Sequence, residues 1–212
     1  MMSNDALIME LSANLGPVRR RSVLRDAALL LALGSVELAL LLGLNLMRPD
    51  MGEVIGSTYM LWKLGGLASL AVISGVTAIS SFSPPKSPRQ GLTITFGLAV
   101  LAMIAGAILG SDAEGTLLER LSPIHGIICS LCIIILSLPM MAMMAVLMRR
   151  AAPSHPERSA MVAGLAASTW AALIFAVCCP VNDPLYVIVW YSAACAIVTA
   201  ASRWLLPRGF RL

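Results

Sequence analysis

The sequence has few charged and few aromatic residues, and this limits what kind of protein it can be. Charged residues make up 12% and aromatic residues 5% of its 212 positions, while hydrophobic residues make up 58%. Soluble domains carry about 25% charged residues, and a soluble chain of this size could not bury so much apolar surface. The composition therefore excludes an ordinary soluble enzyme, a disordered chain and a domain that binds nucleic acid directly.

The chain also lacks the alternating pattern of a membrane β-barrel, and no connection between its apolar stretches is long enough to fold by itself. Six stretches are each long enough to cross ~30 Å of hydrocarbon as a helix. We expect an all-α polytopic membrane protein with spans at 27–46, 58–80, 91–110, 126–148, 160–178 and 185–205. The chain then divides into a cytoplasmic segment, 1–26, and a transmembrane domain, 27–212.

Basic residues are distributed unequally between the two sides of this predicted domain. With the N-terminus inside, only Arg48, Lys63 and Arg120 of the 15 Lys and Arg residues fall on the outer side. Such an excess marks the cytoplasmic side, so both termini are expected there. Lys63, a few residues into its span, is expected to snorkel outward. An aromatic belt is expected at the outer interface, made of Tyr59, Trp62, Tyr186 and Trp190.

The N-terminal segment contains the pattern of one short amphipathic helix. Its apolar stripe consists of Leu7, Ile8, Leu11 and Leu15, and Gly16-Pro17 ends the pattern. A helix this short is marginal in water and needs a surface on which to bury the stripe. That surface is either the membrane or a groove in a partner protein. The polar face carries Asp5 and Glu10 but no basic residue, which favours the partner protein.

The five cysteines do not form the framework of a secreted disulfide protein, since they lie in or beside apolar stretches. Cys129 and Cys179 fall near the outer ends of the fourth and fifth spans, at a similar depth, where facing helices can bring two thiols together. His125 lies four residues before Cys129, so a soft-metal site of His125, Cys129 and Cys179 is one interpretation. The alternative is that the cysteines are small packing residues. No bound cofactor is expected.

Several pieces of the sequence resemble one family, in the same order and at similar spacing. They are Asp5–Leu11, Pro17–Arg20, Cys129, Leu136–Pro139, Arg149–Pro156 and Cys179–Tyr191. The family comprises the NrsF-type proteins, which are six-span anti-sigma factors of the bacterial inner membrane and are described as negative regulators of sigma-F. The resemblance extends over the whole chain.

The resemblance implies a binding and signalling function and no enzymatic activity. The cytoplasmic segment would hold an extracytoplasmic-function sigma factor at the membrane through Asp5, Leu7, Ile8, Leu11, Leu15, Pro17 and Val18. The family's paired cysteines map onto Cys129 and Cys179, which implies a sensor there. Cys178 stands where the family often has histidine, and it is a further candidate sensor residue. The implied partners are the sigma factor and membrane lipid.

Two functions of other classes remain open. Cys129 to Cys132 spells C-x-x-C, which a quinone-coupled membrane thiol oxidoreductase would use together with Cys178 and Cys179. Glu37, near the middle of the first span, could be the centre of a small ion or solute transporter. Stripes of small residues, one of which includes Gly164, predict close helix contacts within the bundle or between copies in a homo-oligomer.

Overall fold

The structure is a computed structural model that describes Met9, Ala13 and residues 22–82, 88–111, 116–151, 153 and 155–208. Six long helices cover most of these residues: α2 (Val23–Gly43), α4 (Thr58–Ser81), α5 (Arg89–Leu109), α7 (Pro123–Ala151), α8 (Pro156–Cys178) and α9 (Pro184–Arg208). The described part of the chain contains no strand. All six helices are long and apolar enough to cross a membrane. The predicted all-α class with six spans is confirmed.

The ends of the helices differ from the prediction by a few residues. The helix α2 begins earlier than expected, because the Ser22 hydroxyl accepts a hydrogen bond from the Arg25 amide at 3.3 Å and caps the helix. It ends at Gly43 instead of residue 46, and Asn45 just beyond it has a positive φ of 54°. Two short helices in the loops were not predicted. They are α3 (Met51–Val54) and α6 (Leu117–Leu121), the second of which begins with a capping box.

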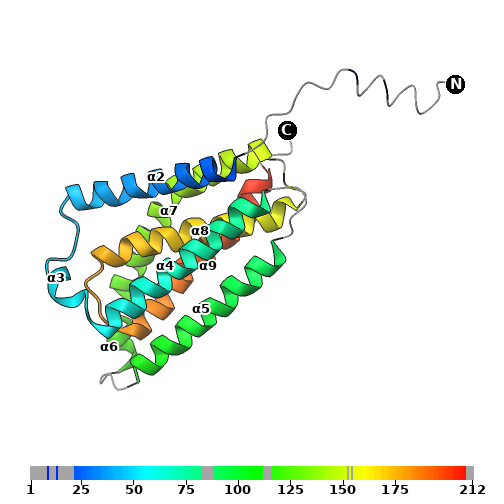
Figure 1. Cartoon of the computed structure of the whole chain (residues 1–212). Coiled ribbons are helices and arrows are strands. Elements are labelled where there is room, and N and C mark those ends of the chain that lie inside the picture. The colour runs from blue at the N-terminus through cyan, green and yellow to red at the C-terminus, as the bar shows by residue number, and fades with distance from the viewer. Residues whose placement is uncertain are drawn as a thin grey trace.

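The helix α8 lies at the centre of the bundle and packs against α9, α4 and α7 (Figure 1). Its small residues make this possible. A Cβ atom on Gly164 would overlap the hydroxyl of Ser202, and that hydroxyl donates a hydrogen bond to the carbonyl oxygen of Ala160 at 3.0 Å. The predicted small-residue stripe on this helix therefore serves contacts within the bundle.

The helices α2 and α5 are at the periphery. Buried residues on α2 form one narrow stripe, which consists of Asp26, Leu30, Gly34 and Glu37. Figure 1 shows that α3 and α6 lie at one end of the bundle, while the start of α2 and the end of α9 lie at the other. We call the first of these the α3–α6 end. The residues discussed next are gathered there.

Candidate functional site at the α3–α6 end

The turn between α8 and α9, residues 179–183, is the centre of the site. The helix α8 stops at Cys178, and Cys179 is extended, as expected for a residue before a proline. The carboxylate of Asp183 accepts a hydrogen bond from the Leu185 amide at 2.8 Å, which satisfies a free N–H at the start of α9. This geometry directs Cys179 into the bundle, where only 1% of its surface is exposed.

Arg48, from the loop between α2 and α3, holds the turn from one side. Its guanidinium donates two hydrogen bonds to the carboxylate of Asp50, at 2.8 and 2.6 Å, and a third to the side-chain oxygen of Asn182 at 2.8 Å. Its backbone N–H points at the carbonyl oxygen of Val177, near the end of α8, at 3.4 Å. Arg48 is buried, so the loop after α2 is fixed to the turn that carries Cys179.

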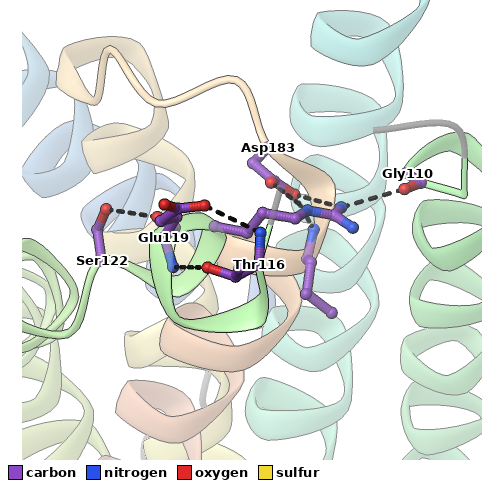
Figure 2. A network of polar contacts seen from close by, with 7 residues as sticks. Gly110, Thr116, Glu119, Ser122 and Asp183 are labelled. Atoms are coloured by element: carbon purple, nitrogen blue, oxygen red, sulfur yellow. Dashed lines mark hydrogen bonds and ion pairs between the residues drawn. The ribbon is translucent and has the colours of Figure 1, made fainter. Parts of the chain in front are cut away.

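Arg120, on α6, holds the turn from the other side. Figure 2 shows Asp183 and Gly110, the two residues that accept its hydrogen bonds. Its guanidinium donates to both carboxylate oxygens of Asp183, at 2.8 and 3.0 Å, and to the carbonyl oxygen of Gly110 at 3.1 Å. These hydrogen bonds hold the pKa of Asp183 below its ordinary value. One arginine thereby joins α6, the end of α5 and the start of α9.

Cys129, on α7, and Cys179 belong to the same packed cluster of the core at this end. Both are free thiols. The hydroxyl of Tyr186 donates a hydrogen bond to the Sγ of Cys129 at 3.1 Å. The two cysteines that were predicted to share a depth therefore lie in one cluster of the core.

Lys63, on α4, is the residue whose position the sequence analysis missed. It does not snorkel outward, because it is 1% exposed and its Nζ lies 5.5 Å from the ring centre of Tyr191 and 5.8 Å from that of Tyr59. These rings offer partial compensation for the buried charge. The aromatic belt is also wrong in part, since Tyr186 is fully buried and belongs to the thiol site. Hydropathy alone contains no signal for either position.

The other three cysteines are placed differently. Cys178 ends α8 beside Cys179 and is half-buried. Cys132 is about one helical turn further along α7 than Cys129 and therefore lies further from the loop that carries Cys179. Cys195 is on α9 and lines a cavity between helices. Residues three apart on a helix are neighbours, so Cys132 lies near Cys129 on α7, and the C-x-x-C interpretation stays a prediction.

The metal site of His125, Cys129 and Cys179 is not formed. No group of three or more His, Cys, Asp or Glu side chains among the described residues is arranged to hold a metal ion. His125 is exposed near the start of α7, whereas Cys179 is buried. Residues four apart do share a helix face, but His125 lies one turn nearer the start of α7 and is exposed, whereas Cys129 is half-buried.

The predicted sigma-binding residues cannot be placed against this site. They are Asp5, Leu7, Ile8, Leu11, Leu15, Pro17 and Val18, and all seven lie outside the described residues. Glu37, the proposed transport residue, is 7% exposed on α2, and neither carboxyl oxygen has a hydrogen-bond partner. It belongs to the stripe that holds α2 on the bundle.

Comparisons with known proteins point to one family. A family model described as a negative regulator of sigma F, NrsF, matches residues 11–212. The chain is 32% identical to a protein of Caulobacter vibrioides named anti-sigma-F factor NrsF, over 97% of this chain and 99% of that one. It is 29% identical to a probable anti-sigma-F factor NrsF of Azospira oryzae, over 90% of each chain. No solved structure matches.

Proposed function

The chain belongs to the NrsF family of negative regulators of sigma F and is an anti-sigma factor, and on this premise we propose that it holds an extracytoplasmic-function sigma factor at the bacterial inner membrane. The single observation that carries the proposal is the family match, which extends over nearly the whole chain. Membership in this family supports a regulatory role, and the proposal includes no enzymatic activity.

The sigma factor binds the N-terminal segment in this proposal. The segment before α2 is the longest stretch of chain outside the six long helices, and its stripe of Leu7, Leu11 and Leu15 needs a surface to cover it. Both termini lie in the cytoplasm, which the excess of basic residues on that side supports. The α3–α6 end, with the thiol pair, then faces the oxidising compartment outside the membrane.

The thiol pair of Cys129 and Cys179 acts as the sensor. Oxidation of the two thiols to a disulfide, with two electrons and two protons passing to an oxidant, would draw the α8–α9 turn against α7. Arg48 is bonded to that turn, and through it the movement reaches the loop after α2. The helix α2 follows the sigma-binding segment in the chain, so we propose that it transmits release.

The decisive experiment is capture of the sigma factor by the full-length protein in detergent. Purified protein would be immobilised, lysate of the source bacterium passed over it, and retained proteins identified by mass. We expect a sigma factor to bind the native protein and to be lost from a variant carrying Leu7→Asp, Leu11→Asp and Leu15→Asp. The matched control carries Asn4→Asp, Ser12→Asp and Asn14→Asp, which add the same charge without changing the apolar stripe.

Retention by the control and loss from the leucine variant would support the proposal. Equal retention by all three proteins would place the binding site elsewhere in the chain. If no sigma factor were retained even by the native protein, the proposed sequestration would be wrong.

A further inference from the structure

A pocket of about 450 Å³ lies between α5, α8 and α9 at the end of the bundle opposite the α3–α6 end. At this end α5 and α8 begin and α9 approaches its last residue (Figure 1). Each of the three helices contributes one arginine to the lining, namely Arg89, Arg158 and Arg203. All three side chains are exposed and therefore accessible to a ligand. We call this space the basic pocket, and the proposed function uses no part of it.

The basic pocket carries more positive charge than its own carboxylate can neutralise. Glu157 is the acidic residue of the lining, and its Oε2 lies 3.7 Å from the Nη2 of Arg203. Both side chains of this ion pair are more than half exposed, so the pair is weak. Two positive charges of the lining remain without a counter-charge in it. Guanidinium groups match the paired oxygens of phosphates and carboxylates, so the pocket favours an anion.

An apolar groove of about 520 Å³ continues from the basic pocket along the bundle, among α4, α5, α8 and α9. The linings of the two spaces share Met161 and Arg203. The groove also includes Ile188, which precedes Arg203 by fifteen residues, or about 22 Å along a helix. This length exceeds half of the ~30 Å hydrocarbon core of a bilayer. The groove is therefore long enough for an acyl chain of one leaflet.

The apolar groove is open toward the membrane. Phe96 and Val100 on α5 and Trp204 on α9 belong to its lining, and they are 52%, 53% and 64% exposed, respectively. A lipid can therefore enter it sideways from the bilayer. A free inorganic anion, or an acidic surface of another protein, would match the arginines but would leave the groove empty. A basic pocket at the membrane surface that continues into an apolar groove favours a phospholipid.

We propose that the basic pocket binds the phosphate of an anionic phospholipid and that the apolar groove takes one of its acyl chains. Basic pockets between transmembrane helices are known to hold head groups of this kind. A zwitterionic lipid is disfavoured, because its cationic group would lie close to the three arginines. Lipid binding at this site requires neither the sigma factor nor the thiol pair, which is at the other end of the bundle.

The test is native mass spectrometry of the full-length protein, delipidated in detergent and titrated separately with dioleoylphosphatidylglycerol and dioleoylphosphatidylcholine. The two lipids have the same acyl chains and differ in head-group charge. We expect one molecule of phosphatidylglycerol to bind the native protein at least about tenfold more tightly than phosphatidylcholine. Inorganic phosphate, the probe for a head group without chains, should not displace it at equal concentration.

Variants of the arginines test the head-group contacts. Arg89→Gln, Arg158→Gln and Arg203→Gln should each weaken binding of phosphatidylglycerol about fivefold, which corresponds to about 1 kcal/mol per basic residue. Arg150→Gln is the matched control, because it removes the same charge in the last turn of α7, outside the basic pocket. We expect the control to bind as the native protein does.

A further variant tests the groove without altering a charge. Ala99→Phe on α5 fills space that Ala99 lines, whereas Ala105→Phe adds the same side chain at an exposed position of α5 outside the groove. We expect only the first to weaken binding, with unchanged helical content by circular dichroism in both.

The proposal is overturned if the two lipids bind the native protein alike, as in unspecific lipid association. It is also overturned if a variant with all three arginines changed binds phosphatidylglycerol as well as the native protein does, or if Ala99→Phe has no effect. Displacement of the lipid by inorganic phosphate at equal concentration would assign the basic pocket to a free anion instead.

Discussion

The hydroxyl of Tyr186 donates a hydrogen bond to the Sγ of Cys129 at 3.1 Å and so joins α9 to α7 through a fully buried side chain. Tyr186 follows the α8–α9 turn that carries Cys179. The tyrosine thus connects the turn that holds one thiol to the helix that holds the other. Changes at this pair of residues should affect how the two halves of the thiol site are held together.

Tyr186→Phe removes this hydrogen bond and leaves the ring in place. We expect the free energy of unfolding to fall by about 0.6 kcal/mol, and by no more than about 1.7 kcal/mol, as for other hydrogen bonds between membrane helices. Thermal unfolding in detergent measures the change. Tyr191→Phe is the matched control, because the Tyr191 hydroxyl is buried without a hydrogen-bond partner and its loss should cost nothing. Equal destabilisation by both variants would contradict this interpretation.

The pairing of Asp183 with Arg120 predicts a dependence of stability on pH. The pKa of Asp183 is lower in the folded protein than in the unfolded chain. Its ionised form therefore stabilises the folded state fully above the ordinary aspartate pKa of about 4, and this stabilisation is lost as the pH falls through the folded-state pKa. Asp183→Asn should therefore be less stable than the native protein at pH 7. The difference in unfolding temperature between the native protein and Asp183→Asn should narrow below about pH 4. Unfolding temperatures of both proteins measured from pH 3 to pH 7 test this prediction, and a difference that stays constant with pH would refute it.

Gly164→Ala should be strongly destabilising. The added methyl group would collide with the Ser202 side chain and press on the Thr199 backbone 3.2 Å away, so α8 and α9 would have to separate. We expect a loss of about 1–3 kcal/mol, as for other overpacked sites. Gly97→Ala is the control, because no atom lies within 4 Å of a Cβ there and the helix propensity of alanine should be neutral or favourable. Comparable losses from both changes would show that close packing is not the cause.

Substitution of either thiol should abolish release of the sigma factor by an oxidant. With the complex captured in detergent, diamide should release the sigma factor from the native protein but not from Cys129→Ser or Cys179→Ser. Cys132→Ser should behave as the native protein does, because Cys132 lies one turn further along α7. Release from all variants alike would remove the thiol pair from the proposed mechanism.

Glu37→Met tests the remaining transport interpretation. Both carboxyl oxygens of Glu37 are buried without a hydrogen-bond partner, a situation that costs roughly 1–3 kcal/mol. A side chain of similar length without a polar group should therefore raise the unfolding temperature while sigma-factor capture is retained. Flux of an ion across vesicles that contain the native protein, lost in this variant, would instead favour a transporter.

The sequence determined the number and class of the six long helices and their ends to within a few residues, because crossing a membrane requires about 20 consecutive apolar residues and this is a local property. It also predicted that Cys129 and Cys179 share a depth, since depth follows from position along a span. The small residues around Gly164 predicted a close contact, although not which helix makes it. The family could be recognised because its motifs, such as Cys179–Tyr191, are continuous in the chain.

Only the tertiary structure decided which side chains meet. Lys63 and Tyr186 have positions in the sequence that suit the membrane interface, yet the packing of α4, α7 and α9 buries both. Arg120 and Asp183 are 63 residues apart and pair because α6 lies against the start of α9. Such contacts depend on how the helices are arranged around α8. Hydropathy does not report that arrangement, because it describes how each residue partitions between water and an apolar phase and not which residue it contacts.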